Sequence, residues 1–349
     1  MFVVASDAHV QHDPPHEFLD GALIPVFETP ARVTIIRAAL ERAGIGPLIA
    51  PRPAGLDAVR AVHDDGYLSY LETIYERWVV AGGAPEAVIP GTLAVRWMAC
   101  RHDHPLAAPG YYTFDTSAPI VAGTYAAARA AADSALTGAA LLLEGQRFVY
   151  ALCRPPGHHA GRDMCGGYCF LNNAAIAAEH LVRSDAGVTC AILDIDFHHG
   201  NGTQQIFYER GDVLFVSIHA APDYQYPYFL GYAEERGVGA GAGRNLNLPL
   251  ARGAGDAEYL AALDRALTAI ADARPRFLVL SAGFDTFEGD PVAAHGGGFA
   301  LSAAAYPEIG RRVAALGLPT LIVQEGGYAI DALGDNVVAL LQGLEEQKV

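Results

Sequence analysis

The chain is poor in basic residues. Lysine and arginine together number 23 of its 349 residues, against 39 aspartates and glutamates, which gives a formal net charge of −16 at pH 7 with neutral histidines. A surface with so little positive charge does not attract phosphate backbones, so binding to nucleic acid is not expected. The acidic balance instead favours encounters with small cations.

Cysteines and uninterrupted apolar runs are also scarce. An odd number of cysteines, five, with no CxxC pair argues against a complete disulfide framework, and we expect free, mostly buried thiols. The most apolar long segment, residues 121–143, is interrupted by Arg129 and Asp133, so a buried helix is expected there rather than a membrane span. Residues 1–7 lack the basic and apolar parts of a secretory signal, so we expect a cytoplasmic protein.

What the chain does contain is an alternation of short β-branched runs with longer segments rich in alanine and leucine. Its composition, 52% hydrophobic and 18% charged, is that of a globular protein, and no linker divides it. We therefore predict one α/β domain over residues 1–349, with a multi-stranded, mostly parallel sheet and helices on both faces. The expected strands are 2–5, 148–152, 190–193, 213–218, 277–280 and 320–323, and the clearest helices are 122–143, 172–182, 258–271 and 302–315.

The segment 194–202, DIDFHHGNG, directly follows an apolar run that is typical of a strand buried on both faces. Side chains alternate along an extended chain, so Asp194, Asp196 and His198 should point to one side. Buried carboxylates are costly unless a cation or hydrogen-bond donors satisfy them. We interpret the cluster as part of a metal site; a purely structural polar network is the alternative.

Four other polar segments also follow expected strands. In open parallel sheets, ligands bind beyond the carboxyl ends of the strands, so all five segments should converge on one site. The four are RPPGHH at 154–159, SIH at 217–219, GFD at 283–285 and EGGY at 325–328.

Asp196, His198 and Asp285 would supply two carboxylates and one imidazole to a metal ion. Three protein ligands leave positions for water and substrate, which is typical of a catalytic rather than a structural zinc site. Oxygen and nitrogen donors also suit Fe²⁺ or Co²⁺, with Zn²⁺ as the default.

A site with two carboxylate ligands acidifies water less than one with three imidazoles, so a general base is expected. His158 and His159 are the candidates, oriented by Asp194 and Asn201; two satisfied core histidines would be the alternative. Tyr328 follows two glycines, and its phenol can donate a hydrogen bond to a developing oxyanion, although such a motif is often only a turn.

These segments, together with GYCFLNN at 167–173, occur in the order found in the zinc-dependent histone deacetylase and acetylpolyamine amidohydrolase family of the arginase–deacetylase superfamily. The chain resembles that family over essentially its whole length. Residues 19–30 and 229–235 look most like the acetylpolyamine amidohydrolases.

The resemblance implies roles for single residues. Asp196, His198 and Asp285 would be the zinc ligands. His159 would be the main base and acid and His158 its electrostatic partner. Tyr328 would be the oxyanion donor, and Tyr168, Tyr226 and Gly167 would line the acyl tunnel. One structural potassium ion is implied at Asp194 and Ser217, and a second at carbonyl groups near Phe207, Arg210, Val213 and Arg244.

The chain departs from its family in two places. Asn201 stands where many histone deacetylases have an aspartate, and a neutral partner should leave His159 less basic. The insertion at about 81–119 shapes the tunnel mouth and a dimer contact in polyamine-specific relatives, and here it has no glutamate beyond Glu86 to hold a distant ammonium group. Glu17 or Asp115 are candidate replacements, although acidic residues are by default solvated.

We therefore expect a homodimeric zinc enzyme that hydrolyses a small, cationic N-acetylated amine to acetate and the free amine, without a nucleic acid or membrane partner. Alternatives are a protein Nε-acetyl-lysine deacetylase and a hydrolase of another small amide, for instance a xenobiotic. A dimanganese ureohydrolase needs a DxD pair where this chain has GFD at 283–285. A catalytically silent binding protein predicts a broken constellation, whereas all the expected groups are present.

Overall fold

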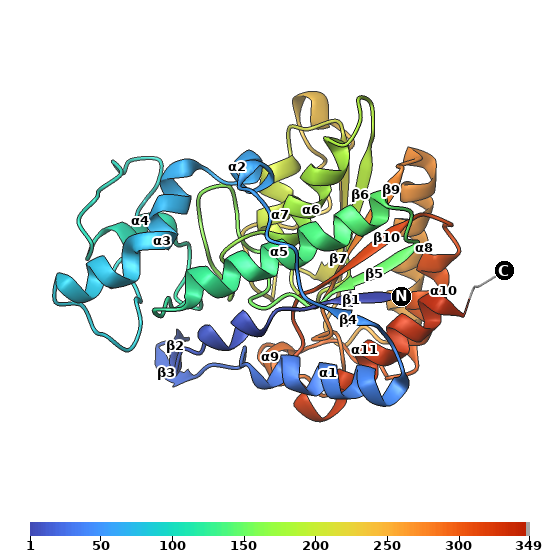
Figure 1. Ribbon diagram of the computed structural model, residues 1–349, viewed down its shortest axis with the longest axis horizontal. Coiled ribbons are helices and arrows are strands. Elements are labelled where there is room, and N and C mark those ends of the chain that lie inside the picture. Colours follow the sequence, from blue (N-terminus) through green and yellow to red (C-terminus); the bar gives the residue numbers. More distant parts are fainter. Residues whose placement is uncertain (347–349) are drawn as a thin grey trace.

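Eight parallel strands form the centre of the protein (Figure 1). The computed structural model describes residues 1–346. The strand order is β4-β1-β5-β10-β9-β6-β7-β8, and every neighbouring pair is parallel. The strands are β1 (Phe2–Val4), β4 (Leu48–Ile49), β5 (Phe148–Ala151), β6 (Cys190–Asp194), β7 (Val213–Ala220), β8 (Asn245–Leu250), β9 (Phe277–Ala282) and β10 (Thr320–Gln324).

Helices cover both faces of this sheet, and alternate strand residues pack against them. Val149 of β5 belongs to the core beneath α5 and α6, whereas its neighbours Phe148 and Tyr150 belong to the core on the opposite face. The first face is covered by α2 (Asp57–Val62), α3 (Asp65–Val80), α5 (Thr124–Leu143) and α6 (Asn173–Val182). The second face is covered by α1 (Ala31–Ala43), α8 (Asp256–Ala273), α10 (Ala305–Ala314) and α11 (Ile330–Glu345).

The predicted α/β class is confirmed, and all six expected strands lie in the sheet. Both edge strands were missed: β4 has only two residues, and β8 carries Asn245 and Asn247, whose side chains donate hydrogen bonds to Gln204 Oε1 at 2.9 Å. The antiparallel hairpin of β2 (His16–Leu19) and β3 (Ala22–Pro25) was also not foreseen.

The cysteines are free, as expected, and four of the five are buried. None of the helices within residues 1–346 combines the length and the apolar composition that a membrane span requires. The segment predicted as a buried helix at 121–143 is α5.

The register of the sheet brings the polar segments to one edge. Asp194, the last residue of β6, pairs with Ser217 of β7 on one side and with Ser281 of β9 on the other. Gln324, the last residue of β10, pairs with Ala282, the last residue of β9. The loops that follow these strands therefore leave the sheet side by side, as expected for a site at the carboxyl ends of parallel strands.

The remaining elements surround this edge. The hairpin β2–β3 lies below the insertion at 81–119, which contains α4 (Ala108–Tyr112) and projects beside α3 in Figure 1. Two short helices, α7 (Asn201–Phe207) and α9 (Pro291–Ala294), follow the loops that leave β6 and β9.

Candidate active site

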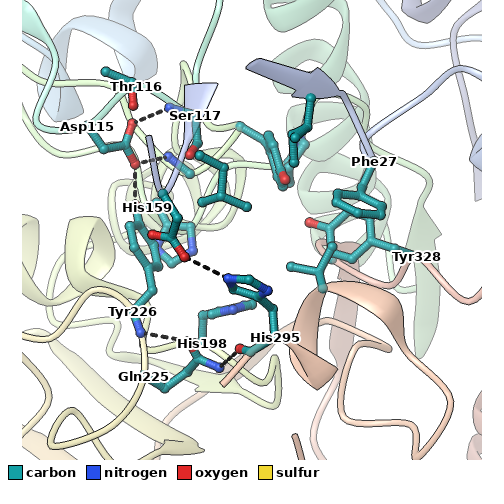
Figure 2. A pocket seen from close by; sticks show the side chains of 18 of the residues that line it. Phe27, Asp115, Thr116, Ser117, His159, His198, Gln225, Tyr226, His295 and Tyr328 are labelled. Carbon is teal, nitrogen blue, oxygen red and sulfur yellow. Dashed lines mark hydrogen bonds and ion pairs between the residues drawn. The ribbon is translucent and has the colours of Figure 1, made fainter. Parts of the chain in front are cut away.

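A cavity of about 530 Å³ opens at the carboxyl edge of the sheet. Its lining comes from the β2–β3 hairpin, the end of the insertion and the loops that follow β5, β6, β7, β9 and β10. In Figure 2, His159 and Tyr226 lie on one side of the cavity, and Phe27 and Tyr328 lie on the other. Three of the predicted segments, 154–159, 194–202 and 325–328, contribute to this lining. The segment at 217–219 lies within β7 and, like the segment at 283–285, is not part of the lining.

Asp196, His198 and Asp285 come together at the base of the cavity. Their ligand atoms all lie within 4.8 Å of one another, and all three residues are buried. His198 Nδ1 lies 3.0 Å from Asp285 Oδ2 and 3.4 Å from Asp196 Oδ1. Gly283 leaves room for this approach, because a Cβ atom there would lie 1.9 Å from Asp196 Oδ2.

The electrostatics of this trio fit a divalent cation. Burial, with the neighbouring carboxylate of Asp196, raises the pKa of Asp285 to about 7. Two carboxylates held together in a buried site need a positive partner, and a divalent cation supplies it. Two carboxylate oxygens and an imidazole form a donor set that Zn²⁺ accepts.

His158 and His159 lie beside these groups, with ring centres 4.0 Å apart. His158 Nδ1 lies 3.0 Å from Asp194 Oδ2, and His159 Nδ1 lies 2.7 Å from Asn201 Oδ1. Asp194 and Asn201 are thus the partners that the sequence indicated.

The two rings have opposite preferences for a proton. Burial lowers the pKa of His158, but Asp196 and Asp194 outweigh burial and raise it to about 10. Burial lowers the pKa of His159 well below its usual value, and the adjacent His158 and His198 lower it further. His158 is therefore the cation of the pair and His159 the neutral imidazole, a separation typical of acid–base sites.

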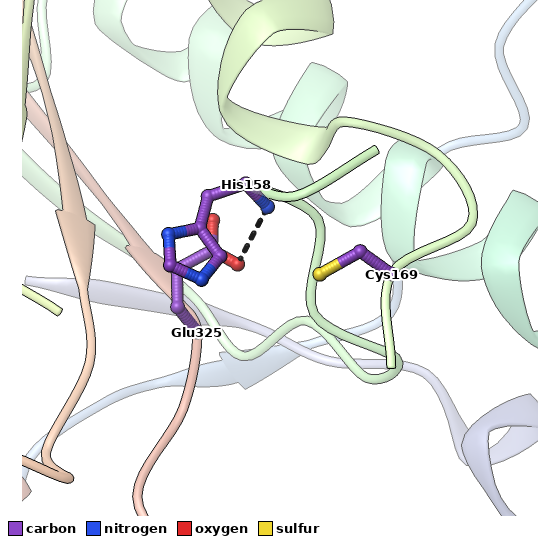
Figure 3. A group of neighbouring side chains, drawn as sticks. All are labelled: His158, Cys169 and Glu325. Atoms are coloured by element: carbon purple, nitrogen blue, oxygen red, sulfur yellow. Dashed lines mark hydrogen bonds between the residues drawn. The ribbon is translucent and has the colours of Figure 1, made fainter. Parts of the chain in front are cut away.

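Glu325 holds the loop that carries the histidine pair, a role that we did not foresee. Its Oε2 accepts hydrogen bonds from the backbone N–H of Gly157 (2.7 Å) and of His158 (3.2 Å), and its Oε1 accepts one from Ser281 Oγ (2.8 Å). Figure 3 shows Cys169 facing His158 and Glu325. The carboxylate is already satisfied by hydrogen bonds, so this second trio is a packing contact rather than another metal site.

Tyr328 lines the opposite wall, and two buried charged groups fix its backbone. Asp290 Oδ2 accepts hydrogen bonds from the N–H groups of Tyr328 (2.6 Å) and Ala329 (3.0 Å). Arg32 donates to the carbonyl groups of Gly327 (2.7 Å) and Glu325 (2.6 Å), and its guanidinium carbon lies 4.9 Å from the Tyr328 ring centre.

Arg32 is itself held in a buried network of charges. Glu28 lies 2.7 Å from Arg32 and 2.9 Å from Arg154, and all three side chains are almost fully buried. No local pattern indicates this network, because a glutamate and an arginine four residues apart usually mark an exposed helix face.

Tyr168 and Tyr226 line the cavity, and each donates its hydroxyl hydrogen to an acidic residue. Tyr168 donates to Glu17 Oε1 at 2.8 Å, and Tyr226 donates to Asp115 Oδ2 at 2.7 Å. The default expectation of a solvated Glu17 is wrong: Glu17 is fully buried, and burial raises its pKa to about 7. It lies behind Tyr168 rather than among the residues that line the cavity.

Gly167 lies between these tyrosines and is required by its surroundings. Its φ is +50°, and a Cβ atom there would lie 2.4 Å from the His159 ring. Its N–H group donates to Asp115 Oδ2 at 2.8 Å. The aromatic loop at 167–173 contributes to both the cavity and the core, since Tyr168 lines the cavity while Phe170 is buried in the core.

The residues expected around potassium ions lie outside the cavity. Asp194 and Ser217 are paired across β6 and β7, and Ser217 Oγ lies 2.8 Å from His219 Nδ1. Two members of the second set already use their carbonyl groups in the backbone: Arg210 N–H donates to Phe207 O at 3.0 Å, and Phe215 N–H donates to Arg244 O at 2.9 Å. Val213, which also belongs to the second set, is the first residue of β7. Potassium binding stays a prediction.

Comparison with known proteins gives a consistent answer. The histone deacetylase domain matches residues 26–344. The chain is 47% identical to acetylpolyamine amidohydrolase 1 of Pseudomonas aeruginosa, over 99% of both chains. It is 45% identical to the acetylpolyamine amidohydrolase of Mycoplana ramosa, again over 99% of both. The crystal structure of acetylpolyamine aminohydrolase from Burkholderia pseudomallei superposes with a TM-score of 0.92 at 39% identity, covering 98% of both chains.

Proposed function

This chain belongs to the histone deacetylase family of the arginase–deacetylase superfamily, which is hydrolytic and metal-dependent, and we propose that it deacetylates small acetylated polyamines and diamines. The observation that carries the proposal is the joint lining of one cavity by Asp196, His198, the His158–His159 pair and Tyr328. The relatives of this chain at 44–47% identity are named acetylpolyamine amidohydrolases, which indicates the substrate class.

Asp196, His198 and Asp285 would hold the metal ion, with Zn²⁺ the expected ion and Fe²⁺ or Co²⁺ also compatible with the donor set. When bound, the metal supplies Lewis acidity for the acetyl carbonyl and for the attacking water.

His159 acts as the general base and then as the general acid. Its Nδ1–H donates to Asn201 Oδ1, so the free electron pair lies on Nε2, and a depressed pKa keeps the ring neutral until a proton arrives. It accepts a proton from the attacking water and returns it to the nitrogen of the departing amine as the amide bond breaks. The products are acetate and the free amine.

His158 and Tyr328 stabilise the negative charge that develops on the acetyl oxygen. The cationic His158 ring lies next to His159 and provides a fixed positive charge. Burial raises the pKa of Tyr328 well above its usual value, so its hydroxyl remains a hydrogen-bond donor. Within residues 1–346 that hydroxyl makes no hydrogen bond, so it is free to donate to the oxyanion.

Acetate release by the metal-loaded protein tests the proposed function. N-acetylputrescine, N-acetylcadaverine, acetylspermine and an acetyl-lysine peptide should be compared at equal concentration. We expect the short acetylated diamines to have the highest kcat/KM. Among the described residues, the cavity lining has no arginine or lysine that would repel a cation, and the insertion has no glutamate beyond Glu86 to hold the more distant ammonium groups of acetylspermine. Equal or faster turnover of the peptide would identify a lysine deacetylase instead, and inactivity on all four would point to another small amide.

We also propose that the insertion at 81–119 forms a homodimer contact. It exposes large apolar side chains, with Trp97 82% exposed and Met98 66% exposed, and clustered exposure of this kind marks interfaces. Trp97→Asp should convert a dimer into a monomer in sedimentation velocity. Phe229→Asp, at an 88% exposed site outside the insertion, is the matched control and should leave the dimer intact. A monomeric wild type would refute the contact.

Potassium ions at the two sets of residues around Asp194 and Arg244 complete the proposal. The pairing of Asp194 with Ser217 at the ends of adjacent strands supports the first ion. Elemental analysis of the protein after dialysis into potassium-free buffer tests both, because tightly held ions should be retained, and an absence of potassium in the dialysed protein would contradict them.

A further inference from the structure

Asp20 lies at the cavity in the turn of the β2–β3 hairpin, and its carboxylate contacts an exposed histidine ring. Asp20 and Gly21 form the two-residue turn of the β2–β3 hairpin, with φ values of 48° and 83°, the left-handed combination that matches the twist of a hairpin. Asp20 Oδ2 lies 2.6 Å from His295 Nε2, and the two side chains are 70% and 65% exposed. Both residues line the same cavity as His158 and Tyr328.

The other carboxylates near the cavity are already engaged. Asp115 accepts hydrogen bonds from Tyr226, Gly167 and Ser117. Glu17 is buried behind Tyr168, and Asp196 belongs to the trio suited to a metal ion. Within residues 1–346, Asp20 is thus the one carboxylate of the lining whose only side-chain partner is exposed enough to move away.

His295 is placed so that its side chain can leave while its backbone stays. Its carbonyl oxygen accepts a hydrogen bond from Gln225 Nε2 at 3.0 Å, and its N–H donates to Val292 O at 3.2 Å. Its ring, drawn in Figure 2, spans the gap between α9 and the hairpin turn. Rotation of this exposed ring would leave the Asp20 carboxylate without its imidazole partner.

We propose that Asp20 determines specificity by binding the distal ammonium group of the substrate, and that His295 occupies the carboxylate until the substrate displaces it. This inference rests on the proposed function. An ammonium group carries a full charge and three N–H donors, so it can replace the imidazole at the same oxygen atoms. The half-exposed Phe18 and Tyr228 rings, which also line the cavity, would cover the methylene chain between the two ends.

The test compares a cationic substrate with a neutral one of the same shape. N-acetylcadaverine has a terminal ammonium group, and N-hexylacetamide has a methyl group in its place. Asp20→Asn should raise KM for N-acetylcadaverine about fivefold, the upper range for a partly exposed ion pair, and leave KM for N-hexylacetamide and both kcat values unchanged. His295→Ala should lower KM for N-acetylcadaverine alone, because it removes the competing ring.

Asp335→Asn is the matched control, because Asp335 is an exposed carboxylate paired with Arg42 away from the cavity. It removes the same charge and should change neither KM. Equal KM changes for the two substrates in Asp20→Asn, or no change for either, would overturn the role of Asp20 while leaving the proposed function intact. A wild-type protein inactive on these two substrates and also on N-acetylputrescine and acetylspermine would overturn the proposed function itself.

Discussion

Tyr328→Phe is expected to lower kcat by about 10²- to 10³-fold, the cost of losing one donor to an oxyanion. The hydroxyl is the only group removed, and the ring keeps its edge contact with Tyr168 and its position beside Arg32. The hydrogen bonds that the Tyr328 and Ala329 N–H groups donate to Asp290 are also retained. Folding and metal content should therefore equal those of the wild type.

The measurement is steady-state acetate release together with metal analysis and thermal unfolding of the same sample. Tyr75→Phe is the matched control, because its hydroxyl donates to Pro85 O outside the cavity. Only the Tyr328 variant should lose turnover. Wild-type kcat in Tyr328→Phe would show that the oxyanion is stabilised without this phenol.

Asp285→Asn is expected to lower metal affinity by more than about 100-fold. Changing a residue that only supports a metal ligand already costs up to about 100-fold, and Asp285 is assigned as a ligand itself. The side chain is fully buried, and it also accepts a hydrogen bond from Phe197 N–H at 3.0 Å. Asparagine keeps an oxygen for that bond but loses the negative charge, so we expect the fold to persist while metal and turnover are both lost.

Elemental analysis after gel filtration, paired with circular dichroism, separates these outcomes. Asp256→Asn is the control, since its carboxylate accepts hydrogen bonds from Ser302 outside the cavity. It should retain metal. Full metal occupancy in Asp285→Asn would remove Asp285 from the ligand set. If Asp285→Asn does not fold, the metal affinity of Asp285→Glu, which keeps the carboxylate, is measured by titration instead.

Together the two variants separate metal binding from oxyanion stabilisation. Asp285 and Tyr328 follow different strands, β9 and β10, and meet only in the folded protein. A variant that keeps its metal but not its turnover belongs to the catalytic group, and a variant that loses both belongs to the metal group.

Much of this architecture was readable from local patterns. Strands buried on both faces leave continuous apolar runs, and the polar residues that follow them must lie at one edge of a parallel sheet. For that reason Asp196, His198 and Asp285 could be grouped before their positions were known, and the structure brings their ligand atoms within 4.8 Å.

The edge strands and the supporting charges were not readable in this way. β4 is too short for a pattern, and β8 alternates asparagines with leucines because its polar side chains bind Gln204. Glu17 lies at a position where a charged residue is usually solvated, yet the chain folds over it.

The sequence by itself determined the α/β class, the strands that carry the site and the chemical groups of the metal and acid–base set, because each depends on residues near one another along the chain. The tertiary structure alone decided which charges support them. Arg32 reaches Gly327 across 295 positions, and Asp20 reaches His295 across 275. Contacts of that span arise from the packing of distant elements, and no local pattern encodes which acid will meet which base.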